Sequence, residues 1–329
     1  MREVADKFVL VRLVRISGAD LSLFDFDYDL TWAGIFLSAD ETVYGRFGGR
    51  DDKSDDGRLS IAGLAYAMQR ALTRHTAGDE KPAPRGKPVK AEEFAAAKAR
   101  KGNSCIHCHQ VNEFQRADAK ATGTWIRASL WVYPPPETIG LTLDLDRGDL
   151  VKSVAPNSAA AKAGLKAGDV LERLNGHRVA SFADAQFALH HAPASGSVPV
   201  EWTRGDKSLK TGLDVRDGWK KSNITWRASL HDVIPELLIS GADLTTAEKT
   251  ALGLPKKRAA FRQDKFVHST LRAVGLKTGD VIVGVDGSGV DGTMDDFIAF
   301  VRGEHLIGET VVLKVLRDGK AIELKLTLK

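Results

Sequence analysis

Residues 163–171 read Ala-Gly-Leu-Lys-Ala-Gly-Asp-Val-Leu, and residues 274–282 read Val-Gly-Leu-Lys-Thr-Gly-Asp-Val-Ile, an offset of 111 positions. A second match lies upstream: Arg-Ala-Ser-Leu occurs at 127–130 and again at 227–230, an offset of 100 positions. Two matches in the same order indicate two copies of one structural unit, with an insertion or a longer lead-in in the second copy.

The first copy alternates short apolar runs with turn residues. These runs predict strands at 139–143, 150–154, 169–174, 198–202 and 209–215. Ser158 and Ser181 are suited to cap helices over 159–163 and from 182 to about 191, because a serine hydroxyl accepts a hydrogen bond from a helix N-terminal amide. Asn175-Gly176 predicts a tight turn. The unit is therefore a small β-barrel or sandwich with two helices.

This order of elements resembles a PDZ domain of the bacterial stress-protease type. The first copy carries the resemblance in Ile139-Gly140-Leu141, in the block 157–169 and in Leu174-Asn175-Gly176. The second copy keeps Leu252-Gly253-Leu254, the Gly-Leu-Lys-x-Gly-Asp block and a helix capped by Thr293. The resemblance implies PDZ domains at 124–216 and 250–329, separated by a connector at 217–249.

A PDZ fold binds a polypeptide by adding it as a strand to an open sheet edge, opposite a helix. Main-chain N–H groups around Gly140 would receive a carboxylate. The candidate peptide-binding residues are Ile139, Gly140, Leu141, Thr142, Leu143, Phe182, Gln186 and Leu189 in the first copy, and Leu252, Gly253 and Leu254 in the second. Pro255 lacks an N–H in the expected second edge strand, so we expect the ligand in the first groove.

Helical spacing leaves open which side of the first domain's second helix faces that groove. Two faces are possible. One carries Phe182, Ala185, Gln186 and Leu189, and the other carries Ala183, Phe187 and His190.

Residues 1–78 have a different pattern. We expect a buried strand at 8–14, a hairpin of 30–37 with 42–47, and a helix from Ser60 to about His75. This order resembles the C-terminal half of a thioredoxin-like fold, an incomplete domain because a thioredoxin's Cys-x-x-Cys helix would precede Val4. No catalytic residue transfers to it. The run Phe-Asp-Phe-Asp-Tyr-Asp at 24–29 lacks the spacing of a calcium loop and predicts a capped, solvent-facing loop.

The proline-rich residues 79–90 predict a linker, and 91–123 a short helical segment that begins with a helix over 91–101 and a Gly102-Asn103 cap. This segment holds both cysteines of the chain, in Cys105-Ile106-His107-Cys108-His109. We favour a dithiol site in which Cys105 attacks, Cys108 resolves, and His107 or His109 tunes the thiolate. A helix over 110–116 would place Cys108 near its N-terminus, where the helix dipole lowers a thiol pKa.

Three other interpretations of this motif stay open. Cys-x-x-Cys-His is the attachment sequence of haem c, with His109 as the iron ligand, although no Met follows before Met294 and few residues surround the motif. A zinc site would need ligands from elsewhere. The pair could also be an inert dithiol or a structural disulfide. The favoured interpretation needs no cofactor, and haem c is the alternative.

The order of thioredoxin-like segment, Cys-x-x-Cys-His and PDZ domain resembles a bacterial group of thioredoxin-like/PDZ (seleno)proteins. In some members selenocysteine stands at the position of Cys105, which implies redox chemistry. We therefore predict a multidomain α/β and α+β protein that is a redox-active tandem-PDZ adaptor. The alternatives are a haem electron-transfer protein with PDZ modules and a non-catalytic scaffold. No Gly-x-Ser-x-Gly nucleophile indicates a self-contained peptidase.

Composition narrows the class of protein further. Of the 329 residues, 43% are hydrophobic and 27% charged, with a net charge of +4, which suits a soluble protein of several domains. Basic runs are short, so no nucleic-acid partner is expected, and no apolar stretch approaches the ~20 residues of a membrane span. The start of the chain, with Glu3 and Asp6, is unlike a signal peptide. We expect a cytoplasmic protein, or an extracytoplasmic, periplasmic one if a leader precedes Met1. The oligomeric state stays open.

Overall fold

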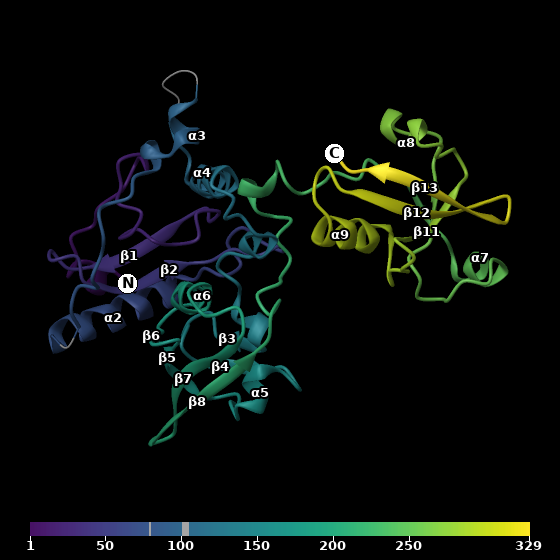
Figure 1. The fold of residues 1–329 in the computed structure, drawn as a ribbon. Coiled ribbons are helices and arrows are strands. Elements are labelled where there is room, and N and C mark those ends of the chain that lie inside the picture. The colour runs from purple at the N-terminus through teal and green to yellow at the C-terminus, as the bar shows by residue number, and fades with distance from the viewer. Residues whose placement is uncertain (79, 101–104) are drawn as a thin grey trace. The chain divides into compact units, whose positions relative to one another are not determined.

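The computed structural model describes residues 1–78, 80–100 and 105–329. It consists of two compact units, Met1–Ser229 and Leu230–Lys329 (Figure 1). Each unit is described by itself. A one-turn helix, η4 (Ala228–Leu230), lies at the boundary between them along the chain.

The first unit begins with α1 (Arg2–Ala5), the antiparallel hairpin β1 (Ala33–Leu37) and β2 (Val43–Gly48), and α2 (Ile61–Ala77). The hydroxyl of Ser60 accepts from the N–H of Gly63, and Gly78 ends the helix at φ 67°. Helix α2 packs on β2 through an apolar core made of Phe36, Tyr44, Phe47, Ala67, Met68 and Ala71. The predicted hairpin and helix are confirmed. They do not by themselves define a thioredoxin-like domain, which stays a prediction.

The predicted strand at 8–14 is wrong. These residues form no strand, and Val9 and Val11 are 92% and 85% exposed. A β-branched run becomes a strand only where a neighbouring strand offers its main-chain groups, and in the described residues β1 pairs with β2 alone. Only Phe8 is anchored, with its ring centroid 5.9 Å from that of Phe36.

The predicted helix over 91–101 is broken in two. It consists of η1 (Ala91–Glu93) and α3 (Ala95–Lys98), followed by α4 (Cys108–Ala121). Phe94, in an extended conformation at φ −60° and ψ 143°, interrupts the helix and packs with Ala91 and Val111. Its burial outweighs the helical preference of its alanine-rich neighbours. The predicted cap at Gly102-Asn103 lies outside the described residues.

The rest of the first unit has the predicted order of short strands and capped helices. Its elements are η2 (Arg127–Leu130), η3 (Pro136–Ile139), β3 (Leu141–Leu143), β4 (Val151–Val154), α5 (Ala159–Lys162), β5 (Val170–Leu174), β6 (His177–Arg178), α6 (Phe182–His190), β7 (Gly196–Arg204) and β8 (Lys207–Val215). Strand β3 pairs with β4, and an antiparallel sheet has the order β6-β5-β7-β8. The hydroxyls of Ser158 and Ser181 cap α5 and α6, as predicted.

The second unit contains one five-stranded antiparallel sheet of order β13-β12-β11-β10-β9. Its elements are β9 (Gly241–Asp243), α7 (Thr246–Ala251), β10 (Phe261–Gln263), α8 (Ser269–Ala273), β11 (Val281–Val285), α9 (Met294–Glu304), β12 (Thr310–Arg317) and β13 (Lys320–Thr327). Helix α9 covers a core that includes Phe261, Phe297 and Leu313. Its cap, the hydroxyl of Thr293, is as predicted.

Main-chain hydrogen bonds show which strands of the two copies correspond. The carbonyl of Gly140 accepts from Ala155, and that of Ser240 accepts from Asp264. Strand β9 is therefore the counterpart of β3, at the offset of 100 positions, although it lies inside the predicted connector 217–249. The insertion in the second copy is the loop between β9 and β10 that contains α7.

This correspondence corrects the position of the second peptide-binding strand. Leu252-Gly253-Leu254 does not form the loop before an edge strand. Leu252 ends α7, Gly253 has φ 66°, and Pro255 begins a turn closed by the N–H of Arg258. The Gly-flanked apolar pattern that suggested a carboxylate-binding loop belongs instead to a helix end, where glycine adopts the left-handed conformation readily.

Candidate functional site

Strand β3 has the free edge that peptide addition requires. The main-chain groups of Gly140 and Asp144 bond on the β4 side, to Ala155 and Leu150. Because main-chain groups alternate along a strand, those of Leu141 point to the other side, as do those of Leu143. In the described part of the chain no strand pairs there.

The turn before β3 partly matches the predicted carboxylate-binding loop. Gly140 has φ 87°, and a Cβ at this position would lie 2.1 Å from the Cβ of Ser158, so only glycine fits. Its N–H already donates to the carbonyl of Glu137 at 3.0 Å. Ile139 is buried and anchors the turn in the core. The N–H of Leu141 is the donor that this turn directs outward.

The helix wall of this groove is covered. Gln186 is 2% exposed, and its Nε2 donates to the carbonyl of Tyr133 at 2.8 Å. Phe182 lies under the guanidinium of Arg58, 4.7 Å from its ring centroid. Leu189 is buried in the core. The structure therefore brings the predicted strand and helix residues together in one domain, but encloses the helix residues.

The other face of α6 is covered as well. The guanidinium of Arg46 lies 3.4 Å from the ring centroid of Phe187. The ring of His190 stacks on that of Tyr133 at 4.2 Å. Contacts with other segments therefore cover part of each of the two faces that the sequence distinguished.

The corresponding groove of the second unit lies between β9 and α9. On α9, Met294 and Ile298 are half-buried at the edge of the core, whereas Asp295 and Ala299 are exposed. The Oδ1 of Asp243 accepts from the N–H of Met294 at 2.8 Å, which ties the end of β9 to the start of the helix.

The two cysteines differ in environment. Cys105 is exposed, whereas Cys108 is half-buried as the first residue of α4 and packs against the apolar cluster that contains Tyr28 and Val111. Both are free thiols. Burial raises the pKa of the Cys108 thiol. The helix start near Cys108 is confirmed, but the expected lowering of its pKa is wrong, because loss of hydration on burial outweighs the lowering by a main-chain hydrogen bond.

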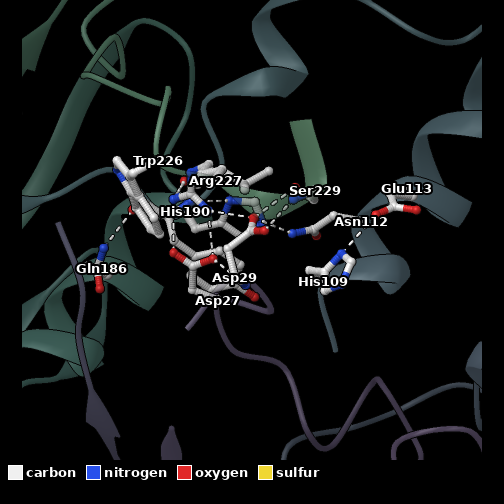
Figure 2. Close-up of polar contacts among 12 residues, drawn as sticks. Asp27, Asp29, His109, Asn112, Glu113, Gln186, His190, Trp226, Arg227 and Ser229 are labelled. Carbon is white, nitrogen blue, oxygen red and sulfur yellow. Dashed lines mark hydrogen bonds and ion pairs between the residues drawn. The ribbon is translucent and has the colours of Figure 1, made fainter. Parts of the chain in front are cut away.

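Both histidines of the motif lie at the start of α4. His107 is the N-cap residue, and its ring stacks on that of His109 at a centroid distance of 5.9 Å. The Nδ1 of His109 lies 2.8 Å from Oε1 of Glu113 (Figure 2). Arg100 donates to the main-chain carbonyl of Cys105 at 3.2 Å.

The acidic run at 24–29 is part of a buried ion cluster, so the predicted solvent-facing loop is wrong. Asp27 and Arg227 are 2% and 5% exposed. Nη1 of Arg227 donates to Oδ1 of Asp27 at 2.6 Å and to Oδ2 of Asp29 at 3.1 Å (Figure 2). The carboxylate of Asp29 also accepts from the N–H and hydroxyl of Ser229 and, at 3.0 Å, from Nδ2 of Asn112 on α4.

This cluster connects three segments that are distant in sequence: the acidic run, the cysteine-bearing helix α4 and the end of the first unit. Burial raises the pKa of Asp27, partly offset by the charge of Arg227. For Arg227 the two carboxylates outweigh burial and raise the pKa. The repeated Arg-Ala-Ser-Leu did not indicate this role. In its first copy Ser129 is exposed, so the motif by itself does not mark a buried position. The alternating acids at 25, 27 and 29 were the available signal.

Comparison with known families identifies both repeated units. A PDZ domain model matches residues 150–204, and a second PDZ domain model matches residues 267–328. The chain thus contains two PDZ domains, as the repeat predicted.

Proteins with similar sequences include bacterial proteases. The periplasmic serine endoprotease DegP of Salmonella typhimurium is 31% identical over 146 residues, 44% of this chain and 28% of that protein. The periplasmic pH-dependent serine endoprotease DegQ of Escherichia coli is 31% identical over 145 residues, 44% and 29% of the two chains. A probable DegP-like endoprotease of Ectopseudomonas mendocina is 28% identical over 229 residues, 64% and 44%. This chain therefore spans less than half the length of these relatives.

A solved structure, an HtrA-type protease with a decapeptide, covers 50% of each chain at 16% identity, but its TM-score of 0.26 is too low to bear on the fold. Over residues 1–78, 80–100 and 105–329, no helix is long and apolar enough to cross a bilayer. In the same residues no three His, Cys, Asp or Glu side chains are grouped to hold a metal ion.

Proposed function

We propose that this protein is a polypeptide-binding adaptor with two PDZ domains and a thiol redox site. The observation that carries the proposal is that each domain retains an unpaired edge strand, β3 or β9, opposite a capped helix. A polypeptide added to such an edge gains main-chain hydrogen bonds, and the helix wall supplies side-chain selectivity.

The difference in exposure between the cysteines supports the predicted division of roles. The Cys105 thiolate attacks one sulfur of a substrate disulfide, and the other substrate sulfur leaves as a thiolate that takes up a proton. Cys108, after losing its proton to solvent or His107, attacks Cys105. This releases the second substrate thiol and leaves a Cys105–Cys108 disulfide. The substrate gains two electrons, and a dithiol reductant must restore the site.

The trapping of a mixed disulfide tests this division. A synthetic peptide with one internal disulfide is mixed with the full chain, and adducts are read by intact mass. We expect Cys108→Ser to accumulate a mixed disulfide, because the resolving thiol is lost, and Cys105→Ser to form at least about tenfold less. Equal adducts on both variants, or none on either, would contradict the dithiol proposal.

The position of His109 favours one alternative, a haem c protein. Its Nδ1 contacts Glu113, which orients the ring and leaves Nε2 for an iron ion, an arrangement typical of metal-ligating histidines. Cys105 and Cys108 would hold the haem through thioethers, and the haem would supply one-electron transfer. A pyridine haemochrome spectrum after expression with a cytochrome c maturation system tests this alternative. Two thiols that remain alkylatable would exclude it.

The remaining predictions belong to the same proposal. Residues 1–78 would be an incomplete thioredoxin-like domain, and the chain would then belong to the thioredoxin-like/PDZ (seleno)protein group. The relatives whose names describe them as periplasmic support an extracytoplasmic location. A scaffold without chemistry is the third function, and it follows if both the trapping and the haem experiments fail while a polypeptide is still bound.

A further inference from the structure

We infer that the first PDZ domain is closed by the chain's own N-terminal segment, through the hairpin β1–β2 and Arg58, and by residues 133–137, so that its helix wall has a resident intramolecular partner. The inference rests on the proposed function only where it concerns access of a polypeptide to that groove. The cover itself consists of contacts within the first unit. It has three parts.

The first part is the docking of β2 on the N-terminal turn of α6. The main-chain N–H of Arg46 donates to Oδ1 of Asp184 at 2.8 Å, and the main-chain carbonyl of Arg46 accepts from the hydroxyl of Ser181 at 2.5 Å. Ser181 and Asp184 are both buried. Strand β2 therefore contacts side chains at the start of α6 through both the main-chain N–H and the main-chain carbonyl of Arg46. A bound peptide likewise uses its main-chain groups. Figure 1 shows β2 and α6 side by side.

The second part is Arg58, which spans the groove. Its guanidinium lies over Phe182 at the start of α6. Its Nη1 also bonds Oε1 of Glu137 in η3 at 2.8 Å, and its Nε bonds Asp51 at 2.8 Å. Glu137 belongs to the turn that leads to β3. One side chain of the N-terminal segment thus contacts both walls between which a peptide would lie.

The third part is Tyr133, which covers the C-terminal half of α6. Its main chain bonds Gln186 and His190, and its hydroxyl bonds Asp25 in the N-terminal segment. The interior left between α6 and the hairpin is a cavity of about 10 Å³ lined in part by Phe47, Ala183 and Gln186. That volume holds about one water molecule, so no side chain of a ligand fits there.

The second PDZ domain shows what such a helix looks like without a cover. Asp296 on α9 is exposed and Ile298 is half-buried, and counted from the N-caps these positions correspond to Asp184 and Gln186 on α6. On α6, by contrast, Asp184 and Gln186 are buried. Since both helices belong to the same fold, the additional burial on α6 comes from the segments that cover it.

Thiol labelling in the full chain tests the cover directly. In a Cys105→Ser/Cys108→Ser background, Ala183→Cys places a thiol at a half-buried position that lines the small cavity beside the hairpin, and Ala299→Cys places one at an exposed position on the helix of the other domain. We expect the thiol at 183 to react with a maleimide at least about 100-fold more slowly than that at 299, because reaction requires local opening. Comparable rates at the two positions would overturn the inference.

A charge reversal identifies the closing contact. Arg58→Glu places like charges beside Asp51 and Glu137, so we expect labelling at 183 to accelerate at least about tenfold while labelling at 299 is unchanged. The double variant Arg58→Glu/Glu137→Arg should restore slow labelling. Asp55→Ala is the matched control, because that exposed side chain pairs with Arg50 in the same loop. An unchanged labelling rate at position 183 in Arg58→Glu would overturn the assignment of Arg58 as the closing contact.

A peptide measurement separates this inference from the proposed function. The probe is a fluorescein-labelled pool of ten-residue peptides with a free carboxylate and apolar final residues. If the cover closes the first groove, Arg58→Glu gains a binding site that the unaltered chain and Asp55→Ala lack. If labelling shows the cover but no variant binds the pool, the cover stands and peptide binding fails. If the unaltered chain binds through its first groove, shown by loss of binding in Leu143→Pro, the inference is overturned.

Discussion

At the scale of single residues, the charged groups of the first unit are informative because so many are buried. Arg227 satisfies two carboxylates, Asp27 and Asp29, and its Nη2 also donates to the carbonyl of Val132 at 2.8 Å. A buried pair of this kind adds little net stability over apolar residues, but removal of one partner leaves a charge without compensation. The cluster therefore fixes the position of α4 relative to the acidic run, and it adds little net stability.

Removal of Arg227 should be costly. We expect Arg227→Met to lower the free energy of unfolding of the first unit by about 3–5 kcal/mol, because two buried carboxylates lose their counter-ion. Urea unfolding followed by tryptophan fluorescence measures the change. Arg127→Met, at the half-exposed equivalent position of the repeat, should cost less than about 1 kcal/mol. Similar losses in the two variants would contradict this account of the cluster.

His190 should make the first unit sensitive to acid. Burial, followed by the neighbouring His191, lowers the pKa of His190 from 6.5 to about 4. The folded state thus favours the neutral ring, whose Nδ1 accepts from the N–H of Tyr133 at 3.3 Å. The contribution is complete above pH 6.5 and is lost as the pH falls from 6.5 towards 4, because the unfolded chain takes up the proton first.

The ring has several titratable and charged neighbours, namely His191, Asp25, Lys220 and Arg227, and His177 lies beside His191. Burial also lowers the pKa of His177, with the same sign. The pKa of Asp25 is lowered despite burial, by its bonds to His191 and Tyr133, so its contribution is lost only below about pH 4. We expect the melting temperature of the first unit to fall between pH 7 and 4.5, and His190→Phe, which keeps the stacking on Tyr133, to flatten that fall. An unchanged slope would contradict the role of His190.

At the scale of elements, the short strand β9 is joined to α9 by a side-chain hydrogen bond. It has three residues, and Asp243 holds its end to α9 through the N–H of Met294. A helix N-terminal amide satisfied by a carboxylate contributes about 1 kcal/mol. The same contact bridges β9 and α9, the two elements between which a peptide would lie.

Asp243→Ala should therefore weaken the second unit. We expect a loss of roughly 1 kcal/mol in its free energy of unfolding, measured by urea titration of the full chain. Glu323→Ala, at an exposed position on β13, serves as the control and should change little. If peptides add to β9, Asp243→Ala should also bind the fluorescein-labelled peptide pool more tightly than the unaltered chain does. A stability identical to that of the unaltered chain would contradict the capping role.

At the scale of the whole molecule, the division into units does not follow the repeat. The first PDZ domain and the N-terminal segment share one unit that ends at Ser229, whereas the second PDZ domain forms a unit of its own. The reason is the set of buried polar contacts between α2, β2 and the first domain, among them the bonds from Arg74 to the carbonyls of Tyr44 and Val179. The first PDZ domain therefore packs together with the N-terminal segment, whereas the second PDZ domain packs as a separate unit.

Fragments should show this difference. We expect residues 230–329 to fold cooperatively alone, because their core is complete within the unit. Residues 124–216 alone should lose stability and bind a hydrophobic dye, because Phe182 and Phe187 lose the guanidinium groups that cover them. Circular dichroism and dye fluorescence measure both. A stable, dye-free 124–216 fragment would contradict the shared unit.

Much of the local structure was predictable from the sequence. Serine caps, Asn-Gly turns and period-two runs predicted α5, α6, β5 and β7, because each depends on groups within a few residues. The strand at 8–14 failed for the opposite reason: its residues favour a strand, but in the described structure no neighbouring strand accepts them. The position of β9 was missed because an inserted helix, α7, carries a glycine pattern like that of a carboxylate-binding loop.

The sequence by itself determined that the chain repeats one unit, that the unit is a PDZ domain, and that a Cys-x-x-Cys-His motif precedes the first copy. These conclusions depend on spacing and on local hydrogen bonds. Only the tertiary structure decided that Asp27 and Asp29 are buried, that Cys108 is shielded while Cys105 is exposed, and that the helix wall of the first groove is covered. Burial and pairing across more than a hundred residues, as between Arg46 and Asp184, depend on packing, which no local pattern specifies.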